Sequence, residues 1–367
     1  MISGKEKIIL LEHSKGHQDS LYAQLLFLIE SGYKPVLWIN ESSAFKEDIV
    51  KGDYDIIKYK FATGKERRVF AKELKKFTRK NNVTNIVFNT AQGVRARNIA
   101  MRFLFSEINV FGILHEAEKL SSRFTQWTLS LIIKKYFVLN DYIEDYCRSL
   151  NVKNIEVKSL YPFFIPYDNI PVINKNENSL LICIPGEVSV DRRNYRFLIE
   201  SIKQNKKKLH PFLKLVFLGC PVNEKGMDVL EMIKENNLDD IIITYDSYIA
   251  EAEYLRIINE SDVILPLIDP DVKCFKECSS NKISGAYSLA FSFRKPLLTH
   301  VSMKHIEDFR NLSVFYDHNN FIEVLNFLAA DKSVLKEKSE KYKEIEKFSF
   351  EYQRKNYIRF ISKNIAK

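Results

Sequence analysis

Short apolar runs alternate with helical patterns along almost the whole chain, and this alternation restricts the possible folds more than any other feature. Continuous apolar strands joined by helices predict a parallel sheet that helices cover on both faces. One such helix is predicted over residues 20–31, where Leu21, Leu25, Leu28 and Ile29 share a face. The strands predicted in the first half are residues 7–11, 35–40, 55–61, 85–89, 110–114, 136–139 and 155–160.

The second half repeats this plan and ends in a long, highly charged helical stretch over residues 333–365. No short-period repeat is present, so two doubly wound domains are favoured over a solenoid. The strands predicted in this half are residues 180–185, 213–219, 240–244, 262–267, 296–300 and 312–316.

A length of 367 residues also indicates two domains. The segment of residues 161–178 is rich in Pro and Asn and is the best candidate boundary. We expect an N-terminal Rossmann-like domain over residues 1–170 and a C-terminal one over 171–345. The helix of residues 346–367 is expected to pack back on the first domain. An apolar share of 46% is enough for two well-packed cores.

Targeting and redox features predict a soluble, cytoplasmic protein. No stretch approaches eighteen uninterrupted apolar residues, and the chain start lacks a signal-peptide cleavage pattern. The five cysteines are odd in number and scattered, which favours reduced thiols. Cys274 and Cys278 lack a second ligand pair at zinc spacing, so no metal site is expected there.

Positive charge gathers in the first half of the chain. The net charge is +9, and residues 1–178 hold 27 Lys and Arg against 20 Asp and Glu. Much of this surplus lies in residues 65–80, a predicted helix whose apolar residues are Val69, Phe70, Leu74 and Phe77. A packed helix with a solvated basic face is one interpretation. The other is a peripheral contact with an anionic membrane, in which each basic residue contributes about 1 kcal/mol. Nucleic acid is not expected, because aromatic-interleaved binding motifs and a reading helix are missing.

Residues 279–300 are typical of a polar, basic loop that opens a helix and then enters a buried strand. The N–H groups and dipole of such a helix start attract phosphate, and Lys282 adds a full charge. We therefore predict a diphosphate ligand here, with Ser280, Asn281, Lys282 and Ser284 as candidate ligand-binding residues. The alternative is ordinary helix capping, because Ser, Asn and Gly begin many helices.

Several segments of the second half follow one another in a specific order. Residues 181–200 hold a strand, a Gly-containing loop, a basic residue and a helix, residues 215–219 form a second strand, and residues 245–267 and 291–296 precede and follow a further helix. The first half adds Gly16-His17, Gly32-Tyr33, Asn89-Thr90, His115-Glu116 and residues 138–146. In this order the segments resemble glycosyltransferases of the GT-B fold, specifically family 4, whose donor helix the further helix resembles.

This resemblance implies two Rossmann-like domains facing a cleft and transfer of a hexose-type sugar from a nucleotide-diphosphate donor. The acceptor would be a glycan or a lipid-linked molecule, and the reaction would need no metal or cofactor and would retain the anomeric configuration. Donor binding would fall to the second domain. Such folds bind ligands beyond the carboxyl ends of their strands.

The resemblance also assigns site residues. Arg193 aligns with a diphosphate-contacting Lys, Arg192 lies beside it, and both follow Gly186, where backbone can approach a phosphate. Tyr245 opens a further donor segment. Positive groups here would bind the charge that develops on the leaving diphosphate. Solvated charge at a helix start is the alternative for the two arginines.

Candidate catalytic residues lie in the first half. His115 follows the strand of residues 110–114 and precedes Glu116. The resemblance directs His115 toward the donor sugar and acceptor, although a histidine at a strand end is often just a satisfied polar residue. Gly16 and His17 form a loop whose backbone could approach the donor or acceptor. An ordinary turn before a helix capped by Asp19 or Ser20 is the alternative.

One departure from the family is clear. Its donor helix commonly carries two glutamates eight positions apart, and alignment on Lys295-Pro296 places Asn281 and Leu289 there; Glu277 has Gly285 as its partner. A catalytically silent sugar- or nucleotide-binding protein would explain this loss. A nucleotide-sugar epimerase of the same fold would need acid and base carboxylates, for which Glu116 and Glu187 are the candidates. The sequence Asp269-Pro270-Asp271 is interpreted as a turn, not as a metal site.

Overall fold

The computed structural model describes residues 5–121, 124–162, 164, 179–221 and 223–362, and these form two compact units. The first unit takes the described parts of Met1–Pro166, Ser280–Lys282 and Lys347–Lys367. The second takes those of Tyr167–Ser279 and Ile283–Glu346. The predicted boundary falls largely on residues 165–178, which lie outside the described residues. Among the described helices, none is long and apolar enough to cross a membrane.

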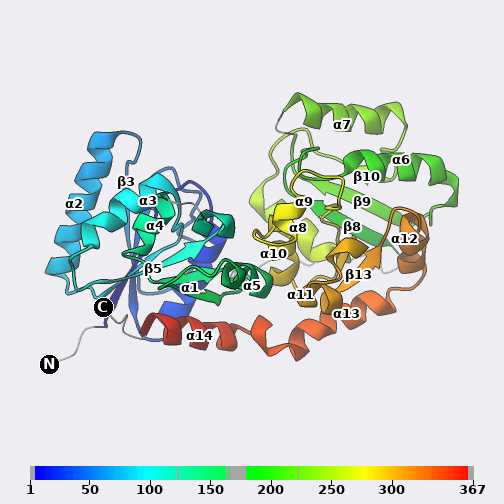
Figure 1. Ribbon diagram of the computed structural model, residues 1–367. Helices are drawn as coiled ribbons and strands as arrows, with labels where there is room; N and C mark the ends of the chain where they lie inside the picture. Colours follow the sequence, from blue (N-terminus) through cyan, green and yellow to red (C-terminus); the bar gives the residue numbers. More distant parts are fainter. Residues whose placement is uncertain (1–4, 122–123, 163, 165–178, 222, 363–367) are drawn as a thin grey trace. The chain divides into compact units, whose positions relative to one another are not determined.

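The first unit is built on a parallel sheet of seven strands, in the order β3-β2-β1-β4-β5-β6-β7 (Figure 1). Strand order reverses between β1 and β4, where Leu10 pairs with Leu37 on one side and Val87 on the other. Doubly wound sheets place ligand sites at such a switch point. The strands are β1 (Lys7–Glu12), β2 (Lys34–Asn40), β3 (Asp55–Tyr59), β4 (Asn85–Phe88), β5 (Asn109–Leu114), β6 (Lys135–Val138) and β7 (Glu156–Ser159).

Helices flank this sheet, and the last one comes from the C-terminal end of the chain. Tyr357 of α14 donates a hydrogen bond to Gln24 of α1 at 3.0 Å, and its ring stacks on Phe137. The helices are α1 (Gln18–Glu30), α2 (Gly64–Lys80), α3 (Gly93–Ala100), α4 (Thr125–Ser130), α5 (Asp141–Ser149) and α14 (Phe350–Ser362), with 3-10 turns η1 (Met101–Phe103) and η2 (Ala117–Ser121).

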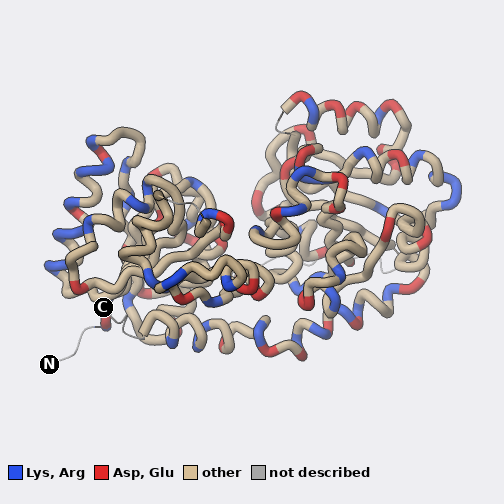
Figure 2. Tube along the Cα trace, viewed as in Figure 1, with Lys and Arg blue, Asp and Glu red and all other residues tan. Residues whose placement is uncertain are grey.

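Helix α2 carries the basic segment predicted from the sequence, and Figure 2 shows its Lys and Arg spread along it. It begins with a capping box, in which the Thr63 hydroxyl accepts from the Glu66 N–H and the Glu66 carboxylate accepts from the Thr63 N–H. Phe70 and Leu74 are buried beneath it. Val69, predicted among its apolar residues, is about half exposed.

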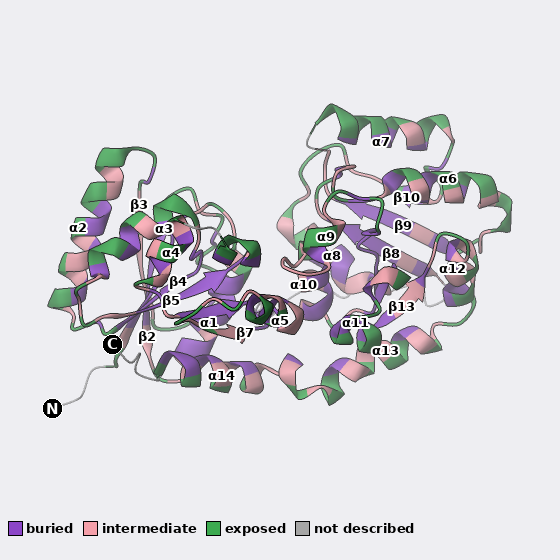
Figure 3. Cartoon of the chain, viewed as in Figure 1, coloured by how far each residue is buried: buried purple, intermediate pink, exposed green. Residues whose placement is uncertain are grey.

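The second unit contains a parallel sheet of six strands in the order β10-β9-β8-β11-β12-β13. Both sheets are buried by their helices, as Figure 3 shows. The strands are β8 (Leu180–Pro185), β9 (Leu213–Leu218), β10 (Ile242–Ile243), β11 (Val263–Ile264), β12 (Leu297–His300) and β13 (Ser313–Tyr316). The helices are α6 (Tyr195–Asn205), α7 (Glu224–Glu235), α8 (Glu251–Glu260), α9 (Phe275–Cys278), α10 (Gly285–Ser292), α11 (Glu307–Leu312), α12 (Phe321–Ala330) and α13 (Ser333–Glu344), with 3-10 turns η3 (Lys206–Lys208) and η4 (Val301–Met303).

The predicted fold class is confirmed, with all thirteen predicted strands present. The helical stretch predicted over residues 333–365 is confirmed as far as residue 362, but it is divided into two helices. Helix α13 ends where Ile345 turns to extended backbone, and a 3-10 turn η5 (Glu346–Phe348) precedes α14. The Ser349 hydroxyl then accepts a hydrogen bond from the Tyr352 N–H at 3.2 Å, which restarts the helix.

Candidate functional sites at the carboxyl ends of the two sheets

A buried carboxylate lies at the carboxyl end of β1 in the first unit. Glu12 is fully buried and accepts hydrogen bonds from the Ser14 N–H at 2.6 Å, the Asn89 amide at 2.6 Å and the Thr90 hydroxyl at 2.7 Å. Burial of a charge is costly unless donors surround it, and here three donors do so. Glu12 therefore fixes the end of β4 against the end of β1.

Asn89 extends this network into the helices. Its Oδ1 accepts from the Ser20 hydroxyl and the Gln24 amide, both at 2.7 Å, and its Nδ2 also donates to the His17 carbonyl at 2.9 Å. Gln24 in turn accepts from Tyr357 of α14. Fully satisfied buried networks of this kind hold the surrounding loops in one arrangement.

Two stacked imidazoles lie on this network. His17 and His115 have ring centroids 3.6 Å apart at an interplanar angle of 22°. His115 Nε2 lies 2.7 Å from the Asn89 carbonyl oxygen. Because a carbonyl can only accept, Nε2 carries the proton and Nδ1 presents a lone pair. Burial, and next the neighbouring His17, lower the pKa of His115 to about 3, so the ring is neutral at physiological pH.

Glu116 is held next to His115 by Gln92. The Gln92 side-chain oxygen accepts from the backbone N–H groups of His115 at 3.1 Å and Glu116 at 3.0 Å. The Glu116 carboxylate lies 3.3 Å from Lys119 Nζ and 3.7 Å from Lys282 Nζ. His115 and Glu116, the two predicted catalytic residues, are thus adjacent and oriented by one amide side chain.

The segment Ser280–Lys282 belongs to the first unit. The Asn281 carbonyl accepts from the Ala117 N–H at 3.1 Å, and the Lys282 carbonyl accepts from the Tyr142 hydroxyl at 3.0 Å. Three residues predicted to bind the donor therefore group with His115 and Glu116. Ser284 begins α10 in the second unit without a side-chain cap bond, and Leu289 is part-buried on that helix.

The loop before α1 differs from the sequence-based alternative. His17 is the residue before the helix and adopts the left-handed conformation, with φ of 65°. Neither Asp19 nor Ser20 is the cap, because both lie within α1; Ser20 instead donates to the His17 carbonyl at 2.9 Å. Gly16 has open space where a side chain would stand. The loop thus leaves room at Gly16 while it fixes the His17 ring on His115.

In the second unit, the loop after β8 begins with Gly186 and the loop after β9 begins with Gly219, and these two glycines approach each other closely. Gly186 has φ of +96°, and a Cβ on Gly219 would stand 2.2 Å from the Gly186 carbonyl oxygen. Larger residues would displace this loop at either position. The sequence predicted such a loop at Gly186 but did not identify Gly219.

The buried Arg193 side chain forms hydrogen bonds with the backbone of the Gly186 loop. Its side chain is only 6% exposed, and its guanidinium donates to the carbonyl of Pro185 and, at 3.3 Å, to that of Glu187. Its Nε is buried with no partner among the described residues. Arg192 is 63% exposed in its side chain and lies 3.8 Å from Glu187. Arg193 thus shapes the predicted diphosphate loop, and Arg192 is the more accessible of the two.

A polar group lies beyond the ends of β11 and β13, where the sequence indicated only the turn at Asp269 and did not identify His318. Asp269 is fully buried and accepts from Asn194 Nδ2 at 2.9 Å, His318 Nε2 at 3.2 Å and the Asp271 N–H at 3.0 Å. The last of these bonds agrees with the turn predicted at Asp269-Pro270-Asp271. The strand-end position of Asp269 and His318 was the signal that could have identified them.

Asp269, Asp271 and His318 present three ligand atoms within 4.8 Å of one another. Three N–H donors already surround the Asp269 carboxylate, which leaves little lone-pair capacity for a cation. We therefore assign no metal to this group.

Tyr245 and Cys274, two further residues of the second unit, have shifted pKa values. Tyr245 follows β10 and is part-buried, and burial raises the pKa of its phenol. The Cys274 thiol donates to the Arg192 carbonyl at 3.4 Å. Its pKa is lowered to about 7, chiefly by its hydrogen bond with Cys278.

No family model matches the chain, and no curated protein does. Several solved structures share its fold at low identity. Sucrose-phosphate synthase from Thermosynechococcus elongatus has a TM-score of 0.66 at 12% identity, covering 97% of this chain and 98% of that one. HepE of Anabaena in complex with UDP and glucose has a TM-score of 0.68 at 11% identity, covering 97% and 99%. The chain has the GT-B fold.

A third structure of this fold is an epimerase. UDP-GlcNAc 2-epimerase from Neisseria meningitidis, bound to UDP-GlcNAc, has a TM-score of 0.61 at 13% identity, covering 98% of this chain and 100% of that one. Identities this low establish architecture, not chemistry. Function has to be argued from the chain's own residues.

Proposed function

We propose that the protein is a glycosyltransferase, similar to family 4, that moves a hexose-type sugar from a nucleotide-diphosphate donor to a glycan or lipid-linked acceptor. The observation that carries the proposal is the Gly186 loop, which glycine and the buried Arg193 shape at the carboxyl end of β8. This position in a doubly wound sheet is where nucleotide ligands bind. Uridine diphosphate is the first nucleotide to test as the carrier of the donor sugar, since HepE was solved with UDP.

The leaving diphosphate gains negative charge as the anomeric bond breaks. We assign its binding to the second unit, with Gly186 giving backbone access, Arg192 supplying an exposed guanidinium, and Tyr245 and Ser284 lining the donor side. Positioned cations stabilise such charge as it forms. The reaction proposed needs no metal or cofactor, and a retaining outcome rests on the family resemblance.

The first unit supplies groups suited to a sugar or acceptor. His115 is neutral, and its Nδ1 can accept a hydrogen bond from a hydroxyl group. Glu116 and Lys282 form a mixed pair 3.7 Å apart, with Ser280 and Asn281 in the same segment. Gly16 and His17 border this group. Basic helix α2 is proposed to contact an anionic membrane that carries the acceptor.

A nucleotide-sugar epimerase is the second candidate, favoured by the Neisseria structure of the same fold. Epimerisation needs carboxylates that remove and return a proton at a sugar carbon. Glu12 is buried beneath three donors, so Glu116 and Glu187 remain the candidates. A silent nucleotide-binding protein would bind donor without turnover.

Incubation with a panel of UDP-hexoses and UDP-N-acetylhexosamines, followed by liquid chromatography and proton NMR, separates these functions. We expect slow release of UDP by transfer to water, accelerated by an acceptor fraction, and no inverted sugar nucleotide. Inversion at a ring carbon without UDP release would contradict the transferase proposal and establish epimerisation. Tight binding with neither product would identify the silent alternative.

A further inference from the structure

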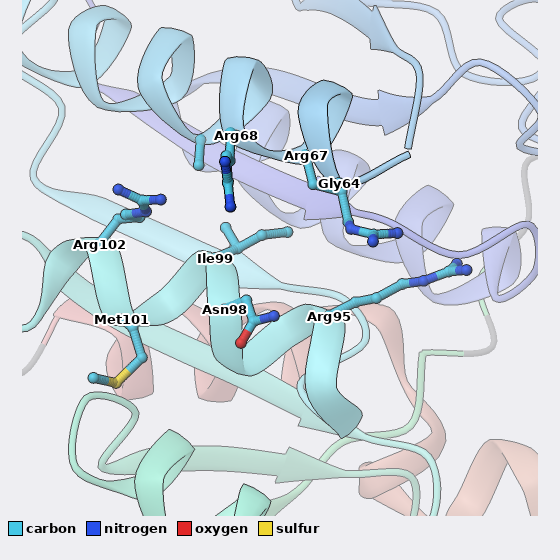
Figure 4. Close-up of a pocket in the computed structure, with 9 residues that line it drawn as sticks. Gly64, Arg67, Arg68, Arg95, Asn98, Ile99, Met101 and Arg102 are labelled. Carbon is cyan, nitrogen blue, oxygen red and sulfur yellow. The ribbon is translucent and has the colours of Figure 1, made fainter. Parts of the chain in front are cut away.

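A pocket of about 410 Å³ lies on the first unit between α2 and the segment of α3 and η1 (Figure 4). Four arginines line it and no acidic residue does. Arg67 and Arg68 extend from α2 toward α3, and Arg95 and Arg102 come from the opposite wall. The remaining lining residues are Gly64, Ala71, Asn98, Ile99 and Met101.

Glu66, the acidic residue that directly precedes Arg67, does not neutralise the pocket arginines, because it caps α2. Glu66 closes the capping box of α2, with its carboxylate 2.7 Å from the Thr63 N–H. Arg67 is fixed by hydrogen bonds to the carbonyls of Ala62 at 3.2 Å and Phe61 at 3.4 Å. Carbonyl dipoles orient this guanidinium, and no carboxylate of the described residues forms an ion pair with it.

The other three arginines are not used by the fold. In the part of the chain that the structure describes, the side chains of Arg68, Arg95 and Arg102 form neither a hydrogen bond nor an ion pair, and all three residues are exposed. Arg97 behaves differently, since it donates to Asn98 Oδ1 at 3.2 and 3.0 Å and leaves the Asn98 amide as a donor. Concentrated like charge in a concave space is unfavourable unless an anion relieves it.

We infer that this pocket binds a phosphate or diphosphate group. Guanidinium groups grip phosphate oxygens in a bidentate manner, and the Asn98 amide adds one further donor. The volume is within the range of small-molecule sites and exceeds that of one phosphate. Ala71, Ile99 and Met101 give one wall an apolar surface for the organic part of a phosphorylated ligand.

The phosphate could belong to a soluble phosphorylated molecule or to a lipid headgroup. Exposed apolar side chains lie on the same segments or just after them, so a lipid source is tested in a separate experiment. They are Val69, Val94, Met101 and, at 99% exposure, Phe105. The inference concerns binding by the first unit and does not depend on sugar transfer.

Calorimetric titration of the full chain with inorganic pyrophosphate at low and physiological salt tests the inference. The double variant Arg68→Gln with Arg102→Gln removes two pocket charges that the fold does not use. Its affinity for pyrophosphate should fall about a hundredfold, because each charge-assisted contact contributes about tenfold. The matched control is Lys72→Gln with Lys76→Gln, which removes two charges from α2 outside the pocket lining.

The control pair should change the affinity by less than about threefold. An equal loss in both double variants would show diffuse attraction to the basic helix and overturn the site. If the wild type binds neither pyrophosphate at low salt nor the phosphate-bearing vesicles described next, the proposed site is also overturned.

Cosedimentation with vesicles identifies the source of the phosphate. Phosphatidylcholine vesicles with phosphatidic acid, which carries a phosphomonoester, are compared with vesicles holding phosphatidylglycerol at matched charge. A preference for phosphatidic acid that Arg68→Gln with Arg102→Gln abolishes supports a lipid source. The lysine pair, which lies on the helix proposed to contact the membrane, should weaken binding to both vesicle types alike and keep the preference. Pyrophosphate binding without that preference supports a soluble source, and the lack of both overturns the inference.

Discussion

Replacement of Arg193 by methionine is expected to destabilise the second unit and to weaken donor binding together. The guanidinium donates to the carbonyls of Pro185 and Glu187, and its loss leaves these acceptors without their donor. Each unsatisfied buried acceptor costs about 1–3 kcal/mol, so loss of the donor to both carbonyls should lower the free energy of unfolding by about 2–6 kcal/mol. The Gly186 loop then loses its shape, and affinity for a nucleoside diphosphate should drop at least about tenfold.

Urea denaturation and calorimetric titration with UDP measure the two effects on the same protein. Arg192→Met is the matched control, because the Arg192 side chain is 63% exposed and its guanidinium lies 3.8 Å from the Glu187 carboxylate. The control should keep its stability within about 0.5 kcal/mol. Loss of UDP affinity in Arg193→Met at unchanged stability would contradict the buried structural role and favour direct contact with phosphate.

Replacement of His115 by glutamine is expected to reduce sugar transfer about a hundredfold while the fold is retained. Glutamine can keep a donor near the position of Nε2 for the Asn89 carbonyl, but its acceptor oxygen does not stand at the position of Nδ1. The loss of an interaction that is made only as the transition state forms lowers kcat and leaves the donor affinity unchanged. Steady-state kinetics with the donor that supports turnover provide the measurement.

The same variant should also change how the free energy of unfolding depends on pH. The folded-state pKa of His115 is about 3, below the value near 6.5 of an unfolded histidine. Between these values the unfolded chain binds the extra proton, so stability falls as pH drops from 6.5 toward 3. This residue contributes a slope of about 1.4 kcal/mol per pH unit, which His115→Gln should remove. An unchanged slope together with full turnover would refute both roles.

The sequence predicted the sheets well because apolar runs buried on both faces have a strong local signal. The runs at residues 8–11 and 36–39 pair in β1 and β2 as such a pattern requires. The break between α13 and α14 was missed because residues 345–349 keep a charged, helix-compatible composition, and only the extended Ile345 and the Ser349 cap end the pattern.

The candidate sites were predictable in position but not in detail. His115 and Gly186 lie at strand ends, as the fold rule requires. The burial of Arg193 could not be predicted, because a basic residue at a helix start is normally solvated and its carbonyl partners arise from the tertiary structure. The network of Glu12 and Asn89 joins residues 77 positions apart and involves polar types with no periodic pattern. The contact between Asp269, which was interpreted only as part of a turn, and His318 was missed for the same reason.

Calorimetric titration of the purified protein with UDP, UDP-glucose, UMP and uridine tests the central claim that the second unit holds a nucleotide-diphosphate donor. We predict saturable, equimolar binding of UDP and of at least one UDP-sugar. UMP should bind about tenfold or more weaker, because it lacks the second phosphate that the Gly186 loop is proposed to receive. Parallel titrations with ADP and GDP cover a different base. Failure of every nucleoside diphosphate to bind, or equal affinity for UDP, UMP and uridine, would contradict the account.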